Sequence, residues 1–234
     1  MEDKREFRSF IVLENLSFPS EPMEISVPKE PLDYKGEKVI IKQYHEKELG
    51  NFLDYEFLWE TKREITSEIL DEETGEIFYE IDYIKKVAQI SVWIYKDFPF
   101  WIVFTKGITP NKVMNLINDY FPSFQLSRLY FKDEFFNLLL NIRSINVLQT
   151  TMKSASTEQE FSISGYLNKS NYSLTDGYIT ELQIEIPSVY IRAKLSNSGR
   201  VALYNTPDKH RVNEFIRLIG EFLIESDTMR RDYR

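Results

Sequence analysis

The sequence predicts an α+β protein, mainly an antiparallel β-sheet with amphipathic helices packed on one face. Apolar and polar residues alternate in several segments, such as 87–95, which is typical of strands with one buried face. Thr-Pro pairs at 109–110 and 206–207 each precede apolar residues at helical spacing, and Thr-Pro is a favoured helix start. The length of 234 residues is enough to bury a self-sufficient core.

The composition excludes several classes of protein. The chain has no cysteine, which rules out disulfide scaffolds, thiolate zinc sites and cysteine nucleophiles. Its two histidines, His45 and His210, are far apart in sequence, so two-histidine motifs such as HExxH are absent. Walker, GxGxxG and GxSxG motifs are absent as well. We therefore expect no cofactor and no catalytic set, and the sequence favours a protein that is not an enzyme.

The polarity of the chain predicts a cytoplasmic protein that makes no contact with membranes. No segment approaches the ~20 consecutive apolar residues that a membrane helix needs. The opening MEDKREFRSF is charged where a signal peptide needs an apolar core. The formal net charge is −8.

We expect two halves, residues 1–121 and 122–234, in one compact unit. In the first half, prolines break the early apolar runs into short strands. The expected elements after these strands are a helix near 46–58, a hairpin across 63–84, strands at 87–95 and 100–105, and a helix from Pro110 to Phe121. The strand at 100–105 is apolar on both faces, which predicts a central strand covered on both sides.

The hairpin across 63–84 carries a concentration of carboxylates. Its predicted three-residue loop ends at Gly75, where a bulged turn needs a left-handed residue. That register pairs Ile69 with Tyr79 on an apolar face and Glu68 with Glu80 on an acidic face, and such a like-charge pair is destabilising. A divalent ion would relieve the repulsion, and the candidate ligands are Glu64, Glu68, Glu80 and Asp82. The alternative is a solvated face that blocks aggregation at the sheet edge.

The second half repeats the order of elements in the first. We expect a short helix from Asp133 to Arg143, strands near 144–152 and 159–167, a hairpin over 178–195, a strand at 200–204, and a helix that begins at Thr206-Pro207. Each half thus has a hairpin, a further strand and a helix that begins with Thr-Pro. Internal duplication is one interpretation, and chance recurrence of a common helix start is the other.

The predicted hairpin at 178–195 has a basic outer face. Its register pairs Leu182 with Ala193 on the inner face and Glu181 with Lys194 on the outer face. The candidate nucleic-acid contacts are Tyr190, Arg192, Lys194 and Arg200, because a basic face with an interleaved aromatic suits phosphates and stacked bases. Ordinary ion pairing across the strands is the alternative.

An aromatic face on the strands of the first half needs a cover. The residues expected to share it are Trp93, Tyr95, Phe100, Ile102 and Phe104. Large exposed apolar patches are rare on monomers, so either the chain itself or a partner must cover this face. We take these five residues as candidate partner-binding residues, with a protein partner or a second copy as the occupant.

Three functional hypotheses follow. The first is a non-enzymatic binding or assembly module that engages protein partners through sheet surfaces. The second is a nucleic-acid-binding protein that uses the basic hairpin face of the second half. The third is a metal-dependent hydrolase that uses the acidic hairpin.

Overall fold

A computed structural model describes residues 7–18, 24–44, 52–70, 74–75, 77–104, 110–167, 177–205 and 207–226. The strands of the first half are β1 (Ser9–Asn15), β2 (Leu32–Tyr34), β3 (Glu37–Tyr44), β4 (Phe52–Leu70), β5 (Ile77–Tyr95) and β6 (Phe100–Phe104). Those of the second half are β7 (Leu126–Arg128), β8 (Asn146–Ser154), β9 (Glu160–Leu167), β10 (Gly177–Ile186), β11 (Ile191–Ser196) and β12 (Arg200–Leu203). The helices are α1 (Pro110–Tyr120), α2 (Asp133–Asn141) and α3 (Lys209–Glu225), with a short 3-10 turn, η2, at Pro187–Val189. The predicted α+β class is confirmed.

A single antiparallel sheet runs through both halves of the chain. Over the described ranges its order is β2-β3-β4-β5-β6-β1-β12-β11-β10-β8-β9, and β7 pairs with part of β1. Strand β1 joins the halves, since β6 lies on one side of it and β12 on the other, both antiparallel to it. The most N-terminal strand therefore holds the two halves of the molecule together.

The order of elements is symmetric about β1. On one side the chain runs β4-β5-β6 and then α1, and on the other it runs β10-β11-β12 and then α3. Strands β6 and β12 point the same way, because both are antiparallel to β1. A two-fold rotation about the axis of β1 exchanges the positions of β6 and β12 and keeps their direction. The same rotation places α1 and α3 on opposite faces of the sheet. This arrangement is compatible with internal duplication, which stays a prediction.

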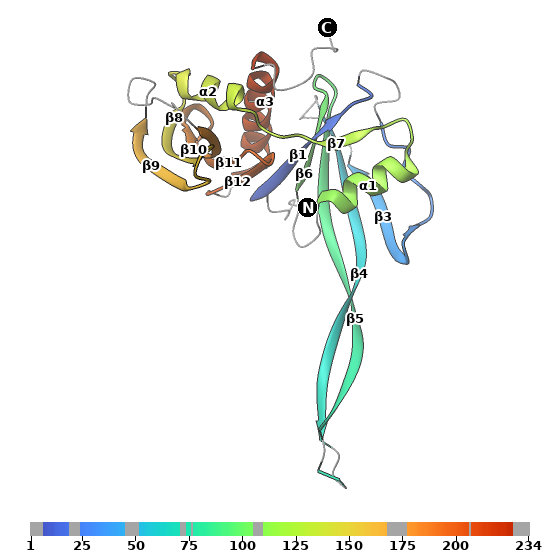
Figure 1. Cartoon of the computed structure of the whole chain (residues 1–234). Coiled ribbons are helices and arrows are strands. Elements are labelled where there is room, and N and C mark those ends of the chain that lie inside the picture. The colour runs from blue at the N-terminus through green and yellow to red at the C-terminus, as the bar shows by residue number, and fades with distance from the viewer. Residues whose placement is uncertain are drawn as a thin grey trace.

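The helices cover both faces of the sheet, and here the structure differs from the expectation of one face. Because neighbouring residues of a strand point to opposite faces, Phe10 and Val12 of β1 lie in one apolar layer and Ile11 and Leu13 in the other. The layer around Phe10 contains the buried residues of α2 and α3, whereas the layer around Ile11 contains those of α1. In Figure 1, α1 accordingly lies apart from the other two helices.

Strand β6 confirms the prediction of a central strand covered on both sides. All five of its residues are buried. Phe100, Ile102 and Phe104 belong to one apolar layer, and Trp101 and Val103 belong to the other.

The prediction of a helix near 46–58 is wrong for its described part. Residues 45–51 lie outside the described ranges, and β4 begins at Phe52. Tyr55, Phe57 and Trp59 alternate into the same apolar layer, a period of two that needs a strand. Aromatic residues fit such a pleated, covered surface well, and this outweighs the helix-favouring residues between them.

The two long helices begin close to the predicted Thr-Pro pairs. Helix α1 starts at Pro110, as expected. Helix α3 starts three residues after Thr206, because Asp208 caps it: the Asp208 carboxylate accepts a 2.9 Å hydrogen bond from the Arg211 N–H. None of the described helices is both long and apolar enough to cross a membrane.

Candidate interaction surfaces

The longest hairpin of the chain leaves the body as a two-stranded arm, which Figure 1 shows projecting away from the helices. Strand β4 pairs with β3 only up to Trp59, and β5 pairs with β6 only from Ser91 onward. Between these points β4 and β5 pair with each other alone. We call residues 60–87 the arm. Eleven strand residues on one side, 60–70, span about 35 Å at ~3.3 Å per residue.

The arm confirms the predicted hairpin but corrects its register by one residue. Glu68 lies opposite Tyr79, not opposite Glu80, which pairs with Ser67. The body sets this register, since Phe57 and Ile90 are paired and share one buried layer. Burial of one face specifies register strongly, and a slip of one residue moves every side chain to the other face. Gly75 does adopt the expected left-handed conformation, with φ of 74°.

The corrected register mixes apolar and polar side chains on both faces of the arm. On one face, the exposed apolar side chains of β5 form what we call the apolar stripe, Ile77, Tyr79, Ile81, Tyr83 and Val87, with Lys85 between the last two. Each of these five side chains is more than half exposed. The residues opposite the stripe on β4 include Glu64, Thr66 and Glu68. The sequence-based register placed Tyr79, Ile81 and Tyr83 on one apolar face opposite Ile69, Ser67 and Ile65, and the structure places Glu68, Thr66 and Glu64 opposite them instead.

The same correction divides the predicted metal ligands. Glu64 and Glu68 lie on the face of the apolar stripe, whereas Glu80 and Asp82 lie on the opposite face. In the parts of the chain that the structure describes, no group of three or more His, Asp or Glu side chains is placed to hold a metal ion. The acidic hairpin therefore does not gather the four carboxylates as predicted.

The predicted partner-binding face lies in the interior. Trp93, Tyr95, Phe100, Ile102 and Phe104 are all buried in the layer that contains α2 and α3. The aromatic rings of the chain itself cover them: Phe7 lies 5.0 Å from Trp93, and Phe98 stacks on Phe100 at 5.0 Å between ring centroids. The chain thus supplies the cover that the sequence demanded, and these residues are not accessible to a partner in this structure.

Two buried carboxylates that the sequence analysis missed lie beside this layer. The Lys209 ammonium, at the start of α3, donates a 2.6 Å hydrogen bond to the Asp54 carboxylate and forms an ion pair with it. Glu56 accepts a 2.7 Å hydrogen bond from the Tyr44 hydroxyl and another from the Gln89 amide. Their alternation with buried Tyr55 and Phe57 was a usable signal, but only once the segment is recognised as a strand.

Helix α3 makes a second buried polar contact with the first half. The Tyr95 hydroxyl donates a 2.7 Å hydrogen bond to the Asn213 side-chain oxygen. Burial raises the pKa of Tyr95 well above its usual value, and Asp54 adds to the rise against the opposing effect of Arg217. The contacts of Lys209 and Asn213 thus position α3 over the sheet.

In the second half, the hairpin of β10 and β11 keeps its predicted faces but shifts its register by two residues. Leu182 pairs with Leu195, and Glu185 pairs with Arg192. The cause is the loop: η2 and a left-handed Tyr190, with φ of 55°, replace the two-residue Pro-Ser turn. Pro-Ser cannot supply the positive φ values of a tight hairpin turn, so the chain uses a longer connection.

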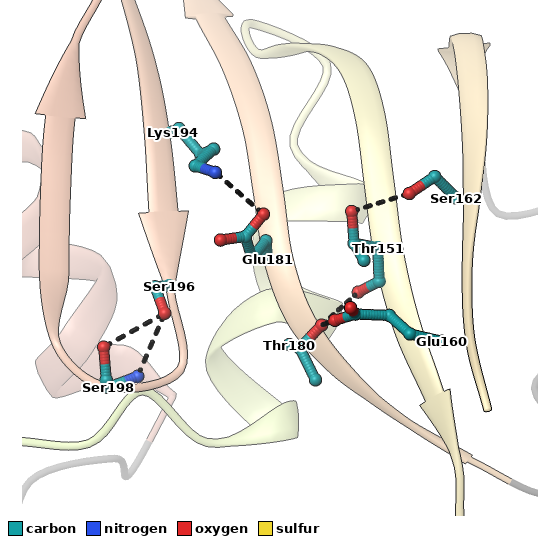
Figure 2. A network of polar contacts seen from close by, with 8 residues as sticks. All are labelled: Thr151, Glu160, Ser162, Thr180, Glu181, Lys194, Ser196 and Ser198. Carbon is teal, nitrogen blue, oxygen red and sulfur yellow. Dashed lines mark hydrogen bonds and ion pairs between the residues drawn. The ribbon is translucent and has the colours of Figure 1, made fainter. Parts of the chain in front are cut away.

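The basic residues of this face are engaged in ion pairs. Lys194 lies 2.9 Å from Glu181, and Arg192 lies 3.1 Å from Glu185. Hydrogen bonds from Asn146 and then from Arg192 lower the pKa of Glu185. Figure 2 shows Lys194 and Glu181 among short polar contacts between neighbouring strands, including the hydrogen bond of Thr151 with Ser162. Such pairing across strands is typical of a solvated sheet face.

A pocket of about 490 Å³ lies at the end of this hairpin. Its lining includes Tyr190, Arg192 and Tyr204. Both tyrosines are exposed, and the Arg211 guanidinium lies 5.4 Å from the centre of the Tyr190 ring. Lys194 pairs with Ala202 of β12, and Arg200 lies two residues before Ala202 on the same strand.

His210, the histidine within the described ranges, is beside a single acidic side chain. His210 is exposed and lies 3.7 Å from Glu214, one helical turn along α3. His45 lies outside the described residues.

No protein-family model matches the chain, and a search of curated proteins finds no match.

Proposed function

We propose that this protein is a non-enzymatic assembly module whose arm is the element that contacts a protein partner. The observation that carries the proposal is the apolar stripe: five large apolar side chains, each more than half exposed, on one face of a ribbon that projects from the body, four of them at successive positions of that face. Large contiguous apolar surfaces on soluble domains mark interaction sites.

The energetics of the arm favour a partner. An isolated two-stranded ribbon is at best marginally stable in water, because neither face is covered. Full burial of an Ile or Val side chain contributes roughly 1.5–3 kcal/mol, so covering Ile77, Ile81 and Val87 would stabilise arm and complex together. The backbone groups along both edges of the arm are also open to further strand pairing.

The body serves as a rigid support for the arm. Both arm strands continue into the centre of the sheet, where Tyr55 and Trp59 of β4 and Val92 of β5 are fully buried. A site on continuous strands is held more precisely than one on a loop. The buried contact of Asp54 with Lys209 fixes the same strand to α3.

Site-specific photo-crosslinking tests this proposal. A photoreactive amino acid replaces Tyr79 or Tyr83 on the stripe, or Tyr130 on the body as a control of similar exposure. In the cells that produce the protein, we expect one discrete cross-linked protein species from both arm positions and none from Tyr130. Equal or weaker cross-linking from the arm than from Tyr130 would contradict the proposal.

A second candidate function, binding of single-stranded nucleic acid, draws support from the pocket beside Tyr190. Two exposed tyrosines next to Arg192 resemble a stacking platform beside a cation. The pairing of Arg192 with Glu185 weighs against it. Replacing Tyr190 and Tyr204 by alanine should then weaken binding of a fluorescent oligothymidine, and unchanged anisotropy titrations would exclude this candidate.

A further inference from the structure

Charge is distributed unevenly along the arm. The register places Lys62 opposite Lys85 and Thr61 opposite Lys86, and Arg63 follows in sequence, so the part near the body carries four cations and one carboxylate, Glu60, which lies 3.0 Å from Lys85. We call this part the root. From residue 64 to residue 82 the sequence holds eight carboxylates and no Lys or Arg. The arm is thus basic at its root and acidic over the rest of its length, and the apolar stripe runs through both zones.

We infer that the partner of the arm is a second copy of this chain, bound with the two arms antiparallel and their apolar stripes face to face. This inference rests on the proposed function, since it names the protein that the arm engages. The argument is charge complementarity on the face of the stripe: an antiparallel pair places Glu68 of each arm against Lys62 and Lys85 of the other. A parallel pair would place acidic zone against acidic zone, and like charges in contact cost affinity.

The register defines the contact more closely. Lys62 and Lys85 form one pair of the ladder, and Glu68 and Tyr79 form another six residues further along the arm. If the Lys62–Lys85 pair of one copy faces the Glu68–Tyr79 pair of the other, then Tyr83 of each copy lies opposite Ile81 of the other copy, beside the two-fold axis. The acidic side chain of Glu68 then meets Lys62 or Lys85, while an aromatic and an aliphatic side chain pack at the centre. Such an isologous contact is closed, so it produces a dimer and not a filament.

The negative charge of the arm beyond its root also disfavours binding of negatively charged partners. A polyanion such as nucleic acid would be repelled by the eight carboxylates of this segment, which contains no Lys or Arg. A different protein with a basic groove is the competing occupant, and the experiment below separates it from a second copy.

Complementary charge reversal provides the test. The root variant carries Lys62→Glu and Lys85→Glu, and the zone variant carries Glu64→Lys and Glu68→Lys; all four side chains are exposed and lie on the face of the apolar stripe. Dimerisation is measured by sedimentation equilibrium of the full chain. We expect the wild type to dimerise and each variant alone to dimerise about tenfold more weakly or worse, because each variant brings like charges together. An equimolar mixture of the two variants should restore wild-type affinity as a heterodimer, since acid again meets base at both ends.

A control variant, Lys38→Glu with Lys96→Glu, makes the same change in net charge on exposed residues of the body and should dimerise as the wild type does. Circular dichroism establishes that each variant is folded. The wild type is measured over a roughly hundredfold range of concentration up to its solubility limit. A wild type that remains monomeric throughout this range would overturn the inference. A mixture that dimerises no better than either variant alone would overturn it as well. If the arm positions nevertheless cross-link to a different protein, the proposed assembly function stands while the second copy as partner fails.

Discussion

The Lys209 ammonium lies 2.6 Å from a carboxylate oxygen of Asp54, joining the first turn of α3 to the strand that extends into the arm. Both side chains are largely buried, at 13% and 3% exposure. The hydrogen bond from Tyr95 to Asn213 lies on the same helix. Two polar contacts thus tie the last helix of the chain to the strands that carry the candidate interaction surface.

Breaking the Lys209–Asp54 pair should destabilise the protein strongly. Replacing Lys209 by methionine leaves a buried carboxylate without this cation, and we expect the free energy of unfolding to fall by about 3 kcal/mol. The exposed Lys194–Glu181 pair offers a matched control, and Lys194→Met should cost less than about 1 kcal/mol. Urea unfolding measures both. Equal losses for the two variants would mean that burial does not set the strength of the Lys209 contact.

Gly199 should tolerate no side chain. It has φ of 75°, and a Cβ there would lie 2.0 Å from the Leu129 carbonyl oxygen, a backbone atom that cannot rotate away. Gly36 has a similar φ of 78° but open space around it, so Gly36→Ala isolates the cost of the left-handed backbone, about 1–2 kcal/mol. We expect Gly199→Ala to lose clearly more stability than Gly36→Ala in thermal unfolding. Similar melting temperatures would show that the turn can shift away from Leu129.

Removing the arm should leave the body folded. Thr61 and Lys86 are directly opposite each other, so an Asn-Gly turn can join them in place of residues 62–85. Because the described side chains of the excised segment are exposed, apart from half-buried Ile65, we expect the free energy of unfolding to change by no more than about 1 kcal/mol. Denaturation followed by tryptophan fluorescence tests this, since Trp59, Trp93 and Trp101 all remain in the body. A body that unfolds without the arm would show that the arm has a structural role.

Alkaline pH should destabilise the protein through Tyr55. Burial raises the pKa of Tyr55 to about 12, whereas the Ile25 N–H that donates to its hydroxyl lowers it slightly. Between pH 10 and pH 12 the unfolded chain releases this proton and the folded chain retains it, so stability is lost as pH rises. We expect a smaller loss over that range in Tyr55→Phe, and the wild-type loss in Tyr130→Phe, whose side chain is exposed. Urea midpoints measured at each pH would contradict this if the two variants behave alike.

Local chemistry predicted several elements of the fold. Pro110 begins α1, alternation identifies the strand around Val92, and the apolar run from Phe100 to Phe104 indicates a strand covered on both sides. These features depend on neighbouring residues only, such as a fixed proline φ or a period of two. The faces of the hairpin at 177–196 were predictable for the same reason.

The registers were not predictable in this way. For the arm, loop chemistry around Gly75 favoured one register, but the buried pair of Phe57 and Ile90 imposed another over the whole ribbon. That single step divided the predicted metal ligands between the two faces and placed Glu64 and Glu68 beside the apolar stripe. For β10 and β11, a left-handed Tyr190 lengthened the turn and shifted the pairing by two residues.

The sequence by itself determined the sheet-rich α+β class, the helix starts near the Thr-Pro pairs and the charge of each segment, because these depend on composition and on local geometry. Only the tertiary structure decided that Trp93 and Phe100 are interior, that the apolar stripe is exposed and that Lys209 meets Asp54. Those outcomes depend on which distant strands and helices pack together, and packing energy over a buried face outweighs the preference of any single turn.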